Sequence, residues 1–474
     1  MPLFGTRGAA SVTGFGGLAK LGYLLRNSLR FRGANNAYLS RTPSVTGNRK
    51  VWTWSGWVKR GQLDSGASDR VLFGSPSQSG NDGIAAIYFE SDQLHTYYDS
   101  SGASPYGPVG PRLYRDPAAW YHIVWAVDAA NTIHYVYVNN TLVSTDSAYY
   151  PPNYEYSMNR SGGYTHTMGT EAWGATNYFD GYMAEVNFVD GQALTPSSFG
   201  KTDPATGQWI PIKYSGTYGT NGFYLKFDDS SAVGKDSSGN GNNWSTSGHS
   251  VTPGVTYDLM TDVPTNTSET TANYCVINGT TSQPTGWGAA TTFSNANLTG
   301  YMPDSGTDAP AYGTIALPRS GKWYWEVIIT NSTVPGAVGV SESSMARPDT
   351  TGPICRMLYS GGGTGVSYAS NGFTNSGSYT FFGNATLGIA CDMDNGAIYF
   401  AVNGTYVNSG VPTSGASKTG AIFTDLLSAS PGGGSWLPMS YGYLGHVHNH
   451  NYGQRPFAYS APSGYKTLNT FNLP

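Results

Sequence analysis

Residues 394–404 read DNGAIYFAVNG, one apolar run enclosed by two Asn-Gly pairs. Asn-Gly supplies the positive φ angles that a type I′ turn requires, and such turns join adjacent antiparallel strands. Two of these turns around residues 397–402 therefore predict a three-stranded meander. Its first strand is expected at 386–391 (TLGIAC).

Similar runs occur along the rest of the chain. They are rich in Val, Ile, Tyr and Trp and are bounded by Gly, Ser, Asn or Asp, which is the composition of strands and turns. The clearest runs are 29–32, 50–58, 70–74, 84–89, 120–127, 134–138, 182–189, 222–227, 321–329, 337–340 and 365–368. A helical turn is expected only near 193–200. We therefore predict an all-β chain of two antiparallel β-sandwiches (jelly rolls) in tandem.

Residues 228–273 are rich in Asp, Ser, Gly, Asn and Thr and indicate a closing loop followed by a linker. The predicted division is an N-terminal docking or oligomerisation segment at 1–30, a sandwich at 31–250, a linker at 251–274, a second sandwich at 275–445 and a C-terminal extension at 446–474.

The composition excludes several classes of protein. Charged residues make up 11% of the 474 residues, against about 25% in an ordinary soluble domain, while there are 63 Gly and 35 Tyr. Tyr, Ser, Gly and Asn form strands and loops, and they also dominate binding surfaces such as antibody paratopes. The net charge of −4 and the lack of a basic stripe argue against a nucleic-acid partner. The cysteines (Cys275, Cys355, Cys391) imply no disulfide framework.

The first 30 residues do not form a membrane anchor or a good signal peptide. The chain has no run of about 18 apolar residues, so no membrane insertion is expected. The segment 14–25 is interrupted by glycines and by Lys20, which makes a poor signal-peptide core. A docking segment that a partner orders is the better interpretation.

The first half resembles the concanavalin A-like, laminin G-type jelly rolls. The resemblance rests on 54–58 (WSGWV), 120–124 (WYHIV), 135–140 (YVYVNN) and 179–186 (FDGYMAEV), and ends at 227–229 with 236–242 (DSSGNGN). The second half, about 275–445, resembles SPRY (B30.2) domains. There the matching residues are 321–327 (GKWYWEV) and 387–396 (LGIACDMDNG), followed by the turn at 403–404.

The tandem, together with the endings 452–459 (YGQRPFAY) and 464–470 (GYKTLNT), resembles virion proteins of marine bacteriophages. This resemblance implies a tail or head fibre on the virion surface, made in the host cytoplasm without a signal peptide. Residues 1–30 would bind other virion proteins. A homo-oligomer, with a trimer favoured by analogy with phage fibres, would bind host-surface polysaccharide through repeated weak sites.

Two other functions fit the same resemblance. One is a purely architectural virion protein, either a capsid decoration or a tail-connecting subunit. The other is a polysaccharide-degrading tailspike, because glucanases of the first fold resemble one another in a Glu-x-Asp-x-x-Glu strand. Retaining hydrolysis requires two carboxyl groups about 5–5.5 Å apart. The nearest match is 185–190 (EVNFVD), in which Asn187 replaces the middle acid and Asp190 the last. We therefore expect no catalytic residues and no enzyme.

Tyrosines in loop-like segments are the candidates for contact with glycans. Aromatic faces bind sugars, but Tyr is also enriched at subunit interfaces, so both roles remain open. The candidates are Tyr97, Tyr98, Tyr149, Tyr150, Tyr154, Tyr156, Tyr441 and Tyr443.

Two groups of residues are candidates for metal binding. The laminin G resemblance implies Ca²⁺, which prefers six to eight oxygen ligands, and Asp180, Asp228, Asp229 and Asp236 are the candidate ligands. The run DSSGNGN is equally an ordinary turn former. The alternate histidines His446, His448 and His450 would share one face of a strand and bind a metal at a trimer axis. Their Gly-flanked surroundings instead favour a polar loop. No cofactor other than Ca²⁺ is suggested.

Overall fold

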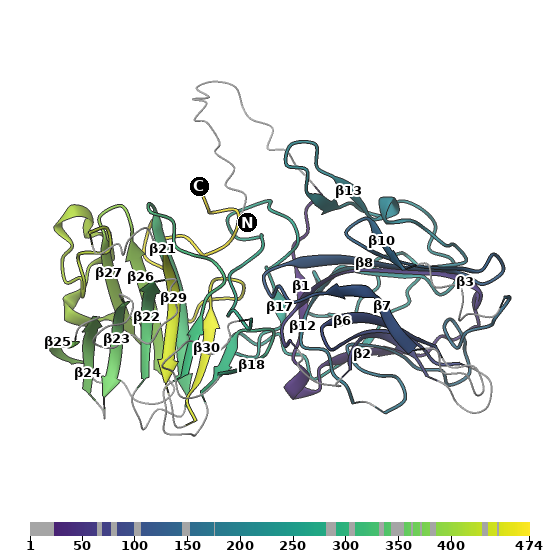
Figure 1. Ribbon diagram of the computed structural model, residues 1–474, viewed down its shortest axis with the longest axis horizontal. Helices are drawn as coiled ribbons and strands as arrows, with labels where there is room; N and C mark the ends of the chain where they lie inside the picture. The colour runs from purple at the N-terminus through teal and green to yellow at the C-terminus, as the bar shows by residue number, and fades with distance from the viewer. Residues whose placement is uncertain are drawn as a thin grey trace.

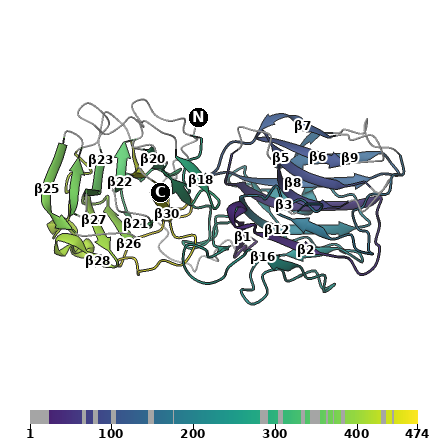
Figure 2. The same ribbon diagram turned by 90° about the horizontal axis from the view of Figure 1, so that it is seen from below.

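The protein forms two β-sandwiches that lie side by side along its long axis (Figures 1 and 2). This computed structural model describes residues 23–63, 69–76, 83–98, 106–144, 152–174, 176–280, 291–302, 309–330, 336–342, 355–361, 364–369, 372–379, 385–428, 435–442 and 445–474. The predicted all-β fold with antiparallel sheets is confirmed. Helical structure in these ranges is limited to the 3-10 turns η1 (Gly33–Asn35), η2 (Pro196–Ser198), η3 (Val407–Ser409) and η4 (Pro412–Ser417). None of the helices in the described residues could span a bilayer.

The first sandwich consists of sheets A and B. Sheet A has the strand order β10 (Thr141–Ser144), β9 (Ile133–Val138), β8 (Trp120–Asp128), β3 (Val51–Arg60), β12 (Gly181–Asp190), β1 (Ser28–Phe31) and β17 (Leu259–Met260), and β15 (Phe223–Leu225) also pairs with β12. Sheet B has the order β16 (Ser245–Ser247), β2 (Tyr38–Arg41), β11 (His166–Met168), β4 (Arg70–Ser75), β5 (Ala85–Glu90), β6 (Gln93–Tyr98) and β7 (Tyr106–Leu113). A separate hairpin joins β13 (Gly200–Thr202) to β14 (Trp209–Pro211).

The second sandwich consists of sheets C and D. Sheet C has the order β18 (Thr292–Ser294), β19 (Thr299–Tyr301), β30 (Val447–Asn451), β21 (Lys322–Thr330), β26 (Ala385–Asp392), β27 (Ala397–Val402) and β28 (Thr405–Tyr406). Sheet D has the order β20 (Ala309–Tyr312), β29 (Trp436–Gly442), β22 (Gly336–Glu342), β23 (Cys355–Gly361), β24 (Thr364–Ala369) and β25 (Gly372–Tyr379).

The core of the first sandwich is aromatic because strand alternation places every second residue of β3 between the sheets. Trp52 and Trp54 are fully buried. Trp52 meets Trp125 edge to face, with ring centroids 4.6 Å apart, and Trp54 stacks on Phe73 of sheet B at 5.9 Å. Trp57 lies on the opposite face of β3, as the alternation predicts, and packs against the second sandwich instead.

The meander predicted from residues 394–404 is present, but its two turns differ. Asn403 and Gly404 have φ angles of 47° and 81°, and Val402 pairs with Thr405, so this is the expected two-residue turn. The other turn is longer, because Asp392 pairs with Ala397. The Asp392 carboxylate accepts the N–H groups of residues 394 and 395 at 3.1 Å each, and this side-chain acceptor stabilises the wider loop.

The two sandwiches meet at an apolar cluster, named here the domain junction. Its buried members are Trp57, Trp120, Tyr182, Ala184, Met260, Val276, Ala296 and Leu298. They come from the outer face of sheet A and from the segment that leads into sheet C. Figures 1 and 2 place β1, β12 and β17 next to the second sandwich, with β18 facing them.

Buried charges reinforce the domain junction. Lys59 Nζ lies 2.7 Å from Asp262 Oδ2, and both side chains are fully buried. The guanidinium groups of Arg30 and Arg32 lie 3.0 Å and 2.9 Å from Asp258 Oδ1. Charges held away from water are stable only when paired and hydrogen-bonded, so these partners fix the path of the segment between the sandwiches.

Asp180 joins residues from both sides of the domain junction. Its buried carboxylate accepts the N–H groups of Gly33 at 3.2 Å, Asn295 at 2.9 Å and Ala296 at 2.6 Å. Gly61 lies against the same place, and a Cβ atom there would be 2.6 Å from Ala296 Cα. The backbone segments around residues 61 and 296 can approach so closely only because residue 61 has no side chain.

The structure places three domain boundaries differently from the sequence-based division. Strand β1 starts at Ser28, inside the predicted docking segment, and residues 1–22 lie outside the described residues. Strand β17 of the predicted linker pairs with β1 in sheet A. Strand β30 of the predicted C-terminal extension lies between β19 and β21 in sheet C. Strand β1 falls in the predicted run 29–32, whereas β17 is short and β30 is polar, and such strands carry too little hydrophobic alternation for the sequence to reveal them.

The three cysteines are buried and none forms a disulfide, as the sequence suggests. Burial raises the pKa of the Cys275 thiol to about 11 and that of Cys391 well above its ordinary value.

Candidate functional site

A cleft of about 300 Å³ on the outer face of sheet B combines aromatic rings with carboxylates. It is named here the aromatic cleft, and its lining residues are Asp69, Val71, Ile84, Tyr88, Glu90, Tyr97 and Trp173. Alternation along β5 sends Ile87 and Phe89 into the core and turns Tyr88 and Glu90 outward. The adjacent strand β6 contributes Tyr97.

The rings differ in exposure. Tyr88 is only 5% exposed and forms the floor, whereas Trp173 is 41% exposed and forms a wall. The rings of Tyr97 and Trp173 have centroids 6.1 Å apart and are inclined at 41°. Two aromatic faces therefore border a hollow that also reaches a carboxylate, Glu90.

The loop that carries Trp173 is tied down by hydrogen bonds. Buried Glu171 accepts a hydrogen bond from the Thr176 hydroxyl and another from Asn177 Nδ2 at 3.0 Å. The Val71 N–H donates to the Asn177 carbonyl at 3.3 Å, which attaches the loop to β4. These bonds anchor the loop that carries the indole, and a loop that is ordered before the ligand arrives lowers the entropy cost of binding.

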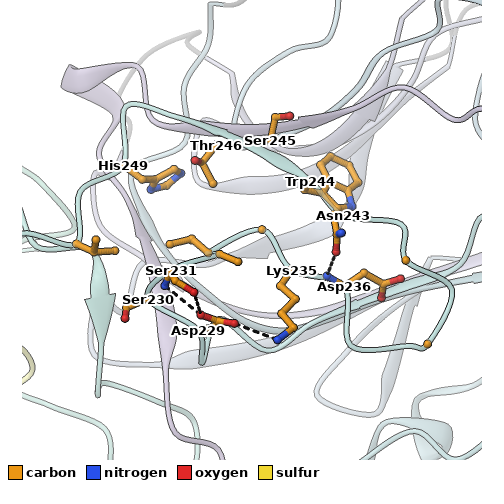
Figure 3. Close-up of a pocket in the computed structure, with 16 residues that line it drawn as sticks. Asp229, Ser230, Ser231, Lys235, Asp236, Asn243, Trp244, Ser245, Thr246 and His249 are labelled. Atoms are coloured by element: carbon orange, nitrogen blue, oxygen red, sulfur yellow. Dashed lines mark hydrogen bonds and ion pairs between the residues drawn. The ribbon is translucent and has the colours of Figure 1, made fainter.

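A second, larger cleft of about 920 Å³ lies between the loop 229–236 and the segment 243–251 (Figure 3). The Asp229 carboxylate accepts hydrogen bonds from the Ser231 N–H and hydroxyl and lies 3.0 Å from Lys235 Nζ. These bonds lower the pKa of Asp229 to about 2. His249 closes one end, and burial lowers its pKa to about 4.

The four aspartates proposed for Ca²⁺ already have protein partners. Asp180 accepts the three N–H groups described above, and Asp228 pairs with Lys226 at 2.8 Å. Asp236 accepts the N–H groups of residues 224, 238 and 242 and the hydroxyl of Ser238. In the described part of the chain, no three His, Cys, Asp or Glu side chains gather as a metal site would require.

The prediction of a polar loop at residues 446–450 is wrong. Residues 447–451 form β30, where His448 and His450 pair with the core-facing Ile329 and Val327 of β21. The imidazoles of His446, His448 and His450 are each at most 1% exposed. His450 Nε2 lies 3.0 Å from the Ser440 hydroxyl. A metal at a trimer axis requires imidazoles on the surface of each chain, so this arrangement contradicts that hypothesis.

Of the eight tyrosine candidates, Tyr97 lines the aromatic cleft. Tyr156 is fully buried in the first core, and Tyr154 packs edge-on against it at 5.1 Å, so neither forms the expected contact loop. Tyr441 is 7% exposed and stacks on Tyr359. Tyr149, Tyr150, Tyr443 and the Tyr98 side chain lie outside the described residues.

The residues of the glucanase-like run are bonded within the fold. Glu185 sits at a β-bulge in β12 with a φ of 51° and accepts hydrogen bonds from the hydroxyls of Tyr23 at 2.8 Å and Tyr224 at 2.6 Å. Burial raises the pKa of Glu185 to about 7. Asn187 accepts the Tyr218 hydroxyl, and Asp190 accepts backbone N–H groups from residues 48 and 221.

The sequence did not single out Trp173 or Glu90. Glu90 follows the outward positions 86 and 88 of a predicted strand, and this alternation could have placed it beside Tyr97. Trp173 lies in an irregular loop, and no local pattern could have brought it to sheet B.

Two family models match the chain. Residues 32–199 match the concanavalin A-like lectin/glucanases superfamily, and residues 322–424 match the SPRY domain. The chain carries a laminin G-like domain followed by a SPRY domain. Each of these two matches covers less than half of the chain. No curated protein matches it.

Solved structures similar to parts of the chain include a heptameric SAP-like pentraxin from Limulus polyphemus, with 18% identity, coverage of 37% of this chain and 80% of that one, and a TM-score of 0.27. A putative carbohydrate binding protein from Bacteroides ovatus has 15% identity, coverage of 47% and 58%, and a TM-score of 0.31. The SPRY domain of human HERC1 has 18% identity, coverage of 32% and 87%, and a TM-score of 0.24.

Proposed function

We propose that this protein binds carbohydrate through the aromatic cleft of its laminin G-like domain and displays that site on the surface of a virion. The observation that carries the proposal is the placement of Tyr97 and Trp173 around a hollow that reaches Glu90. Sugar rings present C–H faces that pack on aromatic rings and hydroxyls that donate to carboxylates. The match to a superfamily that includes lectins supports this role.

The virion role is supported by the resemblance of the tandem to phage virion proteins and by a surface of Tyr, Ser, Thr, Asn and Gly. In this proposal the residues before β1 dock onto the particle, and a homotrimer repeats a weak site to gain avidity. The glycan is part of the host surface.

The first test measures binding of the intact protein to a glycan array and to host cells. Trp173→Ala removes one wall of the aromatic cleft, and an aromatic anchor of this kind contributes about 1–3 kcal/mol, or roughly 5- to 150-fold in Kd. Tyr301→Ala is the matched control, because Tyr301 is 42% exposed but lies in the other domain. Equal binding by the wild type and the Trp173 variant would reject the aromatic cleft as the glycan site.

The virion role needs a separate measurement. Gold-labelled antibody against the SPRY domain should decorate purified particles, and a chain that lacks residues 1–22 should fold but fail to join them. Particles that carry no label would remove the virion part of the proposal and leave the carbohydrate-binding part intact.

A further inference from the structure

Charge at the aromatic cleft restricts the sugars that fit it. Glu90 is 26% exposed, and the partner that faces it is His95, with Nδ1 3.4 Å from Glu90 Oε2. Burial lowers the pKa of His95 although Glu90 opposes the shift, so the imidazole is neutral at pH 7. Among the described residues, the Glu90 carboxylate next to the hollow therefore has no charged imidazole as its partner.

The rest of the lining adds to the same sign of charge. Asp69 supplies a second carboxylate, and the described residues that line the cleft include neither Lys nor Arg. The faces of Tyr97 and Trp173 carry negative electrostatic potential, which attracts cations and repels anions. An anionic sugar such as a uronic acid would meet repulsion from the Glu90 carboxylate.

We infer that the aromatic cleft selects sugars that carry a free, protonated amino group, such as unacetylated hexosamines. The ammonium group would pair with Glu90 while the sugar ring packs on Trp173. The volume of about 300 Å³ is at the small end of ligand sites, which suits one or two sugar units at a time. This inference rests on the proposed function, because it names the ligand class of the same cleft.

The test compares three oligosaccharides of equal length by calorimetry at pH 6. They are a glucosamine hexamer, its fully N-acetylated form and a hexauronic acid. The glucosamine hexamer should bind at least 10-fold more tightly than the acetylated form, and the uronic acid should not bind. Glu90→Gln should remove the preference by weakening the glucosamine hexamer at least 10-fold more than the acetylated form, while Trp173→Ala should weaken both to a similar extent.

A pH series provides a readout that a folding defect would not mimic. Binding of the glucosamine hexamer to the wild type should fall as the pH rises through the pKa of the sugar amine, and binding to Glu90→Gln should fall less steeply, because only Asp69 and the aromatic faces then distinguish the ammonium from the amine. Asp69→Asn serves as the second variant if Glu90→Gln does not fold. Equal or tighter binding of the acetylated form would overturn the amino-sugar inference alone, whereas no Trp173-dependent binding of any hexamer would overturn the proposed function as well.

Discussion

Glu185 is held where its ionised form is disfavoured. Burial raises its pKa to about 7 from an ordinary value of 4.5, although the hydroxyls of Tyr224 and Tyr23 donate to it and oppose the shift. Between these two pH values the native chain binds this proton more tightly than the unfolded chain does. The contribution of Glu185 to stability is therefore complete below about pH 4.5 and is lost as the pH rises through 7.

We expect Glu185→Gln to remove this dependence. The amide cannot ionise; its oxygen accepts one tyrosine hydroxyl and its N–H group donates to the oxygen of the other. The variant should therefore gain up to about 3 kcal/mol relative to the wild type between pH 4.5 and 8. Urea unfolding of both proteins at several pH values gives the difference. Other groups titrate in this range, but they are shared by the two proteins and cancel. A difference that stays constant with pH would contradict the shifted pKa.

For single residues, the sequence shows which side chains can bind a metal or a ligand, but it does not show which of them are instead used inside the fold. Asp180 was a candidate Ca²⁺ ligand, yet it accepts N–H groups at the domain junction. Tyr156 lies in a segment that looks exposed, yet it fills the core. Both outcomes depend on which distant residues surround the side chain, and local patterns do not contain that information.

Among the elements, β3 helps to tie the two sandwiches together, because Lys59 near its end reaches Asp262 after β17. Removal of one member of a fully buried ion pair leaves the other charge without compensation, at a cost of about 3–5 kcal/mol. Lys59→Met should therefore lower the free energy of unfolding by that amount.

A double-mutant cycle with Asp262→Asn checks the origin of this loss. The variant that carries both Lys59→Met and Asp262→Asn should lose less free energy of unfolding than the two single losses add up to, because neither site then holds an isolated buried charge. Lys235→Met is the control, since it disrupts an exposed pair and should leave the free energy of unfolding unchanged. Strictly additive losses at Lys59 and Asp262 would show that the pair is not coupled.

The long strands could be predicted because alternation and flanking turns are properties of the local chain. Strands β3, β8, β12, β21 and β26 all lie within or next to the predicted runs. The short strand β17 and the polar strand β30 could not be predicted, since β17 is a strand only because β1 pairs with it, and β30 only because β19 and β21 pair with it on both sides. Of the residues that line the aromatic cleft, the sequence singled out only Tyr97. Trp173, which forms the other wall, comes from an irregular loop.

For the molecule as a whole, the domain junction predicts that both sandwiches unfold together. A buried apolar cluster, paired charges and the Asp180 carboxylate all span it. Calorimetry of the wild type should therefore show one transition. Asp180→Ala leaves the N–H groups of Gly33, Asn295 and Ala296 without their acceptor and should split this transition into two.

Gly61→Ala perturbs the same contact by steric means and should have the same effect, since its Cβ would approach Ala296. Asp229→Ala is the control because the partners of this aspartate, Ser231 and Lys235, lie in its own loop. Two transitions in the wild type, or one unchanged transition in both junction variants, would mean that the sandwiches are energetically independent.

The burial of all three thiols has a practical consequence. Maleimide dyes react with thiolates that water can reach, so the native chain should remain unlabelled while the unfolded chain takes up three dyes. A single cysteine introduced on the surface would then be the one reactive position, without any replacement of the natural ones. A fluorophore attached beside Trp173 could report ligand capture directly, and the same chemistry would reveal unfolding in a particle by the sudden uptake of dye.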